Sequence, residues 1–154
     1  MHEIKIKDSL SAKRAVEEFL GGLHCSEAIL KVFNECYTLG LPPDLYKIAT
    51  ALGQGLGGAK CCCGSLTGSA LVLSLVAGRN TAEESDELAC SVAKELHDEF
   101  KKRFKATCCR ALTGKVEWGS EEHYSQCSDY VRGAAEITAA LLEQRLNRQM
   151  AEEK

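Results

Sequence analysis

Nine cysteines are the residues of this sequence whose type and spacing could do chemistry. A deprotonated thiol is both a nucleophile and a ligand for soft metal ions. The number of cysteines is odd and five of them stand in two contiguous groups, which is not the spacing of a disulfide framework. The pattern therefore favours metal binding or thiol redox chemistry. The nine positions are Cys25, Cys36, Cys61, Cys62, Cys63, Cys90, Cys108, Cys109 and Cys127.

Composition and charge indicate the compartment in which these thiols work. Residues 1–8 lack the apolar core of a secretory signal, and no stretch approaches the roughly 20 apolar residues needed to cross a bilayer. The net charge of -3 comes without a basic block, so we expect no nucleic acid partner. We expect a cytoplasmic protein without a membrane span, whose cysteines stay reduced unless metal or redox chemistry uses them.

Helical spacing of apolar residues runs through nearly the whole sequence and predicts an all-α fold. The 154 residues are enough for one domain with a hydrophobic core, and no linker or repeat divides them. We expect a single-domain bundle of about five to seven helices over residues 1–154. A capping-box sequence at residues 81–84 marks the expected start of the fifth helix. The expected helices span residues 10–20, 24–40, 43–51, 65–77 and 81–104, with a last one from 127 onward.

Residues 53–64 interrupt the helical pattern with five glycines and three cysteines. Glycine lets the backbone approach a ligand closely, so we predict a site loop here. The charge-free residues 65–77 are too few to span a membrane and are expected to form a fully buried central helix. Gly53, Gly55 and Gly58 match the spacing of a dinucleotide-binding loop, but they follow a helix instead of a strand, so we expect no nucleotide.

Three of the cysteines are predicted at the N-termini of helices, namely Cys25, Cys63 and Cys127. The free amides and the positive dipole end of a helix N-terminus favour negative charge. We therefore expect thiol pKa values lowered toward the thiolate at these positions. The same amides would stabilise an anionic iron–sulfur cluster.

The arrangement of four cysteines resembles that of the redox-active C_GCAxxG_C_C family. The residues that carry the resemblance are Cys25, the stretch Cys63-Gly64-Ser65-Leu66-Thr67-Gly68, Cys109 and Cys127. The central motif departs from the family pattern at Ser65, where alanine is usual. The resemblance covers about residues 15–142 and implies four key cysteines, with Gly64 beside them. The family's members are small proteins of anaerobes and related microbes, and a related domain of split-Soret cytochromes is associated with an iron–sulfur centre.

The hypothesis that we favour is an iron–sulfur cluster, of unspecified type, used for electron transfer or redox sensing with a partner protein. The spacing of the cysteines fits no standard ferredoxin pattern, so the sequence does not give the type of cluster. The expected ligands are Cys25, Cys63, Cys109 and Cys127, with Cys61, Cys62 and Cys108 as further candidates.

Two alternatives remain open at the level of the sequence. One is a metal-free thiol–disulfide oxidoreductase or redox sensor, with Cys25 or Cys63 as the catalytic nucleophile. The other is a thiolate module that binds zinc or another metal. The sequence names no substrate, and it leaves open whether the protein is an enzyme and whether it forms a homodimer.

The other residues that stand out have structural interpretations. Cys36 lies on the inward stripe of its helix and is expected to be a small buried hydrophobe. Cys90 lies off the stripe of its helix and is expected to be a peripheral thiol. His24 precedes Cys25 and is expected to cap the helix or face solvent. Gly64 and Gly68, four residues apart, predict close helix packing.

Overall fold

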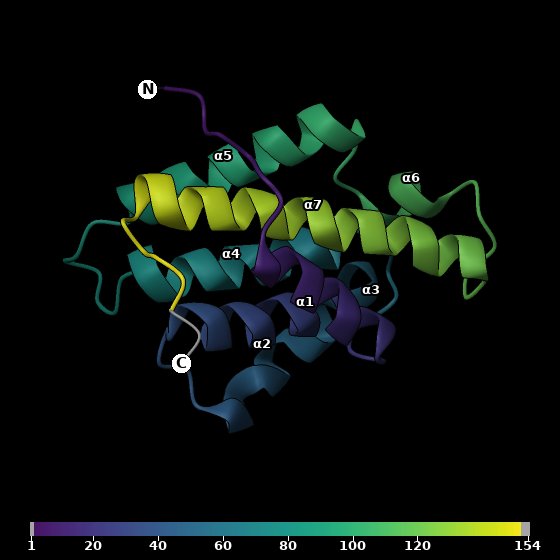
Figure 1. Ribbon diagram of the computed structural model, residues 1–154, viewed down its shortest axis with the longest axis horizontal. Coiled ribbons are helices and arrows are strands. Elements are labelled where there is room, and N and C mark those ends of the chain that lie inside the picture. The colour runs from purple at the N-terminus through teal and green to yellow at the C-terminus, as the bar shows by residue number, and fades with distance from the viewer. Residues whose placement is uncertain (1, 152–154) are drawn as a thin grey trace.

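Seven α-helices and one 3-10 helix make up the computed structural model, which describes residues 2–151 (Figure 1). No strand occurs within these residues, so the all-α prediction is confirmed. The helix expected near residues 43–51 forms as the tighter 3-10 helix η1. The elements are α1 (Leu10–Leu20), α2 (Cys25–Tyr37), η1 (Pro43–Leu52), α3 (Gly53–Leu56), α4 (Gly64–Ala77), α5 (Glu87–Phe104), α6 (Cys109–Thr113) and α7 (Glu121–Arg145).

The C-terminal helix α7 is the centre of the bundle. Helices α1, α4 and α5 each pack against it, and α2 packs against α1 and α4 (Figure 1). Residues 133–142 of α7 are buried without a break, which requires neighbours on every side of the helix. Small residues permit this close approach, and a Cβ at Gly133 would overlap the ring of Phe104.

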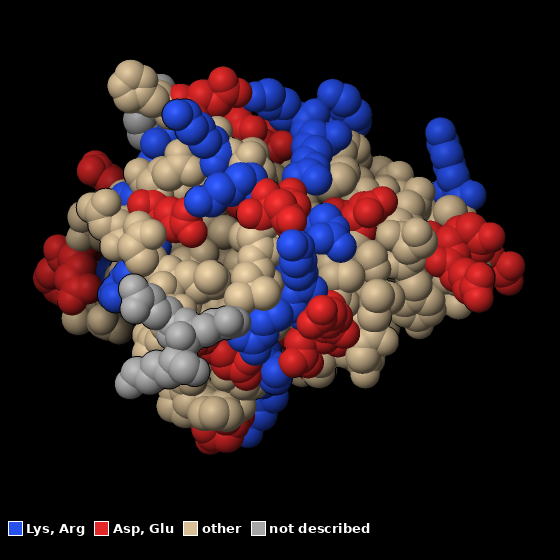
Figure 2. Space-filling view, in the orientation of Figure 1, with Lys and Arg blue, Asp and Glu red and all other residues tan. Residues whose placement is uncertain are grey.

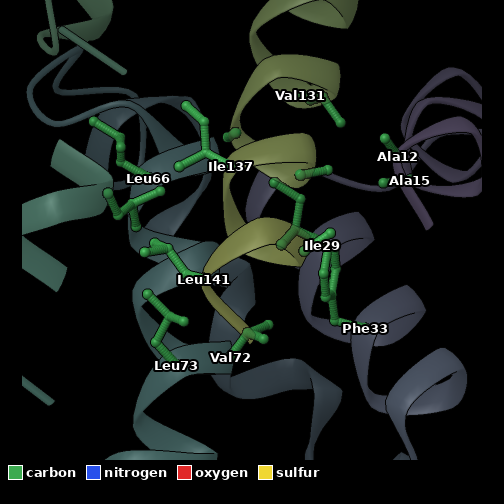
Figure 3. Packing of buried hydrophobic residues seen from close by; sticks show 14 of the residues in the cluster. Ala12, Ala15, Ile29, Phe33, Leu66, Val72, Leu73, Val131, Ile137 and Leu141 are labelled. Atoms are coloured by element: carbon green, nitrogen blue, oxygen red, sulfur yellow. The ribbon is translucent and has the colours of Figure 1, made fainter. Parts of the chain in front are cut away.

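The hydrophobic core holds together the helices that carry the cysteines. Ile29 and Phe33 of α2 are fully buried, and Val72 of α4 and Leu141 of α7 lie near them in Figure 3. Burying a side chain of this size stabilises the fold by about 1.5–3 kcal/mol. The core thereby determines how far α2, α4 and α7 stand from one another.

Helix α4 is not buried along its whole length, contrary to the prediction. Its residues through Leu73 are largely covered, but Ser74 and Leu75 in its last turns are exposed. The absence of charge did not require burial, because apolar atoms contribute more than half of a folded protein's surface. The stretch that is buried on all sides is residues 133–142 of α7.

The predicted capping box at residues 81–84 does not open a helix. The Glu84 carboxylate accepts a hydrogen bond from the Asn80 backbone N–H at 2.9 Å and so closes a turn. Helix α5 begins only at Glu87, whose N–H donates to the Ser85 hydroxyl at 3.2 Å. A carboxylate three residues after a threonine can accept a hydrogen bond from the backbone of a turn as well as from the start of a helix.

The last helix begins six residues earlier than predicted. Helix α7 starts at Glu121, and the Ser120 hydroxyl caps it by accepting the His123 N–H at 3.1 Å. Its first two turns are polar and lack the apolar spacing on which the prediction relied. Cys127 therefore lies about two turns inside a helix and not at its N-terminus.

Charged side chains of both signs interleave over the face of the molecule in Figure 2. No basic area dominates that view, in keeping with the small net charge of -3. None of the helices formed by residues 2–151 is both long and apolar enough to cross a bilayer.

Helices α2 and α4 pack closely together at Gly68. A Cβ at Gly68 would lie 2.7 Å from both the Cα and the carbonyl oxygen of Ser26, which is backbone that cannot move aside. The Ser26 hydroxyl in turn donates to the Ala49 carbonyl at 2.7 Å. The predicted close packing at Gly68 is confirmed.

Gly68→Ala should lower the free energy of unfolding by about 1–3 kcal/mol, because the added methyl forces α4 away from α2. The direction of this change is diagnostic, because replacing glycine with alanine in an exposed part of a helix raises the free energy of unfolding by about 1 kcal/mol. Ser74→Ala, in the exposed part of α4, is the matched control and should change the free energy of unfolding by less than about 0.5 kcal/mol. Urea denaturation measures both, and a stabilised Gly68→Ala protein would contradict this packing.

Candidate functional site

Four cysteines from four different elements line one cavity of about 220 Å³. Cys25 is the first residue of α2, Cys63 directly precedes α4, and Cys109 is the first residue of α6. Cys127 comes from α7. In Figure 1, α3, α6 and the start of α7 gather at the same end of the bundle. The structure thus brings together the four positions singled out in the sequence.

Electrostatic interactions confirm that the four thiols are neighbours. Burial raises the pKa of Cys63, of Cys109 and of Cys127, and the negative charge of an ionised Cys25 raises each of them further. Cys109 has the same effect on Cys63 and on Cys127. Cys25 therefore interacts with every other thiol of the group.

A network of hydrogen bonds holds Cys25 at the start of α2. The His24 backbone N–H donates to the Glu27 carboxylate at 2.8 Å, which caps the helix as expected. The His24 ring nitrogen Nδ1 lies 3.1 Å from the Thr50 carbonyl oxygen and donates to it. His24 therefore ties the start of α2 to the end of η1, and its ring also lines the cavity.

Glycines leave room for the sulfur atoms in this region. A Cβ on Gly64 would overlap the Cys25 Sγ atom, so Gly64 lies directly against that thiol. Gly55 has a left-handed φ of +67°, and a Cβ there would lie 2.7 Å from the Cys109 Cβ. The glycine-rich segment thus lies against two cysteines of the cavity, and its residues 53–56 form the short helix α3.

Two cysteine-bearing segments pair with each other at the edge of the cavity. The Cys63 N–H donates to the Thr107 carbonyl at 2.9 Å, and the Cys109 N–H donates to the Cys61 carbonyl. Cys62 and Cys108 form the isolated antiparallel bridge between these two hydrogen bonds. The bridge fixes Cys63 beside Cys109, although they come from distant parts of the sequence.

Burial raises the pKa of all four thiols, contrary to the prediction from helix N-termini. Backbone amides of Gln54 and Ser26 do lower the pKa of Cys25, but loss of water outweighs them. The pKa of Cys127 rises to about 12, because it is buried near Cys25 and Cys109. Without a bound cation these thiols are protonated at neutral pH.

His123 is a site residue that sequence reasoning missed. It is only 5 % exposed, lines the cavity and packs against Trp118 in a tilted arrangement with 4.1 Å between ring centres. Burial and the charge of Lys60 lower its pKa, so the ring is neutral. Nδ1 accepts the Gly119 N–H at 3.1 Å, which leaves the proton on Nε2. That buried Nε2 has no hydrogen-bond partner.

Ser65 offers a second buried donor at the cavity. Its hydroxyl lies beside the Cys25 and Cys63 thiols and lowers the pKa of each, against the larger effect of burial. It has no hydrogen-bond partner of good geometry. Ser65, which stands where the resembled pattern has alanine, therefore places a hydroxyl donor next to two sulfur atoms.

Aromatic and apolar side chains close the rest of the cavity. Phe19, Leu112 and Tyr130 are among its lining residues. The Tyr130 hydroxyl donates to the Leu112 carbonyl at 2.9 Å and so ties α6 to α7. This bond fixes the helix that begins with Cys109 relative to the helix that carries Cys127.

The other cysteines do not line this cavity. Cys61, Cys62 and Cys108 are exposed. Cys90 is exposed on α5, as expected, and Cys36 is buried on α2, where the Arg14 guanidinium donates to its sulfur at 3.2 Å. Within residues 2–151, no group of three or more His, Cys, Asp or Glu side chains is arranged to bind a single metal ion.

A sequence model of the family described as "Putative redox-active protein (C_GCAxxG_C_C)" matches residues 23–141. This range contains all four cysteines of the cavity and the glycine-rich loop. No curated protein and no solved structure matches the chain.

The reduced, metal-free protein should lose stability as the pH rises from about 8.5, the ordinary pKa of a thiol. Above that pH the unfolded chain ionises its thiols, whereas the folded chain retains their protons up to a pKa of about 12 at Cys127. Stability is therefore fully present below pH 8.5 and falls progressively from there toward pH 12, where Cys127 also ionises in the folded chain. Urea denaturation across this range measures the fall.

Two variants distinguish the buried thiols from the exposed ones in this experiment. Cys127→Ser should make the free energy of unfolding fall less steeply with pH, because it removes one thiol that ionises only on unfolding. Cys90→Ser removes an exposed thiol and should leave the fall unchanged. If the free energy of unfolding falls with pH to the same extent in both variants, burial does not raise the pKa of Cys127.

Proposed function

The chain belongs to the C_GCAxxG_C_C family of redox-active cysteine proteins, and from that premise we propose that its four buried thiols hold an iron–sulfur cluster. The protein would exchange single electrons with a partner protein through that cluster, for electron transfer or redox sensing. The observation that carries the proposal is the meeting of four thiols from four elements around one cavity of about 220 Å³.

The donor set fits such a cluster. Cysteine thiolates are the ligands that hold iron–sulfur clusters, and four of them complete the common types. Burial of Cys25, Cys63, Cys109 and Cys127 disfavours their charged form, so iron would supply the compensating positive charge. A cluster also spreads its ligands around a volume, in keeping with four thiols that line one cavity.

Two buried donors without partners further support the proposal. The Nε2–H of His123 has no acceptor, and the hydroxyl of Ser65 has none of good geometry, although buried polar groups are nearly always paired. Sulfide and thiolate sulfur atoms would accept these hydrogen bonds. Donors of this kind tune the potential of a bound cluster.

A bound cluster would supply a reversible one-electron couple. The chain's own residues would hold the metal, keep water away and set the potential. Trp118, Leu112 and Tyr130 would exclude water from the sulfur atoms. The paired segments would hold Cys63 and Cys109 in place.

Thiol–disulfide exchange by the same four thiols has less support. An attacking thiol must be ionised and accessible. Burial holds the pKa of these thiols above the ordinary range, and Cys63 and Cys109 are each about 6 % exposed.

Replacing any one of the four cysteines should lower the iron content to a similar degree, because each would be a ligand of the same cluster. The variants are Cys25→Ser, Cys63→Ser, Cys109→Ser and Cys127→Ser. Iron and sulfide analysis with visible absorption after anaerobic reconstitution would measure the loss. Cys90→Ser is the control and should retain full iron content. A mixed disulfide trapped by one variant, in protein that never takes up iron, would favour the oxidoreductase instead.

His123→Phe should keep the iron but shift the reduction potential of the reconstituted protein to a more negative value. The ring's Nε2–H would no longer stabilise the added negative charge of the reduced form. His97→Phe, on the exposed face of α5, is the matched control. A potentiometric titration with equal midpoints for the two variants would show that His123 does not contact the cluster.

A further inference from the structure

Cys62 and Cys108 lie directly opposite each other on two paired segments outside the cavity. They form an antiparallel bridge. The hydrogen bonds that flank it run from the Cys63 N–H to the Thr107 carbonyl and from the Cys109 N–H to the Cys61 carbonyl. This pattern makes Cys62 and Cys108 a non-hydrogen-bonded pair, the kind in which the two side chains approach most closely.

The geometry of such a pair suits a disulfide. Opposite Cα atoms of a non-hydrogen-bonded pair stand about 4.5 Å apart, with both side chains on the same face. A disulfide needs Cα atoms about 4.4–6.8 Å apart. The Cys108 thiol donates to the Lys60 carbonyl at 3.3 Å, so its side chain reaches the segment that carries Cys62. The two thiols are therefore neighbours on one face.

Exposure separates this pair from the four cavity thiols. Cys62 and Cys108 are both exposed, whereas Cys63 and Cys109, each one residue further along, are buried. Alternation of side chains along an extended segment accounts for this division. A partner molecule can reach the outer pair without opening the cavity.

We propose that Cys62 and Cys108 form a second redox site, a surface dithiol that reduces a disulfide substrate and closes to a cross-strand disulfide. The thiolate of one cysteine attacks a sulfur of the substrate disulfide and releases one substrate thiol. The thiolate of the other then attacks the mixed disulfide and releases the second substrate thiol. Two electrons pass from the pair to the substrate, and the two protons lost by the pair end on the substrate thiols.

The disulfide would also join the two segments that carry inner thiols. Cys62 precedes Cys63, and Cys108 precedes Cys109. Closure of the outer pair would therefore link the chain immediately beside two of the four cavity cysteines. This site goes beyond the proposed cluster and does not depend on it.

Oxidised glutathione is the probe for the test. The reduced full-length protein is treated with it anaerobically, and free thiols are then blocked by alkylation. Trypsin cleaves after Lys60 and Arg79 and after Lys105 and Arg110. A Cys62–Cys108 disulfide therefore links peptide 61–79 to peptide 106–110, and mass spectrometry detects the linked product. We expect this product to accumulate, with two glutathione molecules released for each disulfide formed.

Four variants assign the linkage to this pair. Cys62→Ser should abolish the linked product and leave one glutathione on Cys108, and Cys108→Ser should leave one on Cys62. Cys61→Ser and Cys90→Ser should behave like the unchanged protein. The proposal is overturned if the linked product survives Cys62→Ser or Cys108→Ser, if the disulfide joins Cys61 to Cys62, or if the unchanged protein carries stable glutathione on both cysteines.

Iron content in the same variants separates this proposal from the cluster. Cys62→Ser and Cys108→Ser should reconstitute with full iron, because neither side chain lines the cavity. A protein that never binds iron but forms the linked disulfide would reject the cluster and keep the surface dithiol. A protein that binds iron fully but never forms the linked disulfide would keep the cluster and reject the surface dithiol.

Discussion

The close approach of α4 to α2 is the contact on which the cysteine site depends. Gly68 lies against the backbone at Ser26, and Gly64 lies against the thiol of Cys25. Because no side chain separates the two helices, the residue that starts α2 and the residue that precedes α4 reach the same cavity. Core side chains such as Phe33 and Leu141 then hold the helices at this distance (Figure 3). A tightly packed interior resists even small changes in such spacing.

Burial, more than helix position, determines the chemistry of the thiols. Burial raises the pKa of Cys25, although its sulfur accepts hydrogen bonds from backbone amides at the start of a helix. Partial charges at a helix end are worth about 0.3–1 kcal/mol at an exposed site, whereas burying an unpaired charge costs several times more. Neutral donors such as His123 and Ser65 line the cavity with the sulfur atoms, but no lysine or arginine among residues 2–151 lines it. Such surroundings favour a bound metal over free thiolates.

Adjacent cysteines in one segment have opposite surroundings. In each of the paired segments a cysteine that faces water precedes one that faces the cavity, so Cys62 precedes Cys63 and Cys108 precedes Cys109. An extended backbone alternates its side chains, and the antiparallel bridge keeps both segments in that register. A single local structure therefore provides two sets of thiols, one protected from solvent and one open to it.

The sequence by itself determined the helical class, and its resemblance to a known family singled out the four cysteines that line the cavity. Apolar spacing predicts helices because it is a local property, and it found α1 with its correct bounds. The motif around Cys63 and Gly64 likewise stands in consecutive residues. The tertiary structure alone decided which thiols are buried, that α7 and not α4 is the central helix, and that His123 lines the cavity. Burial and the pKa values that follow from it depend on residues far away in the chain, so neither short-range spacing nor helix position could supply them.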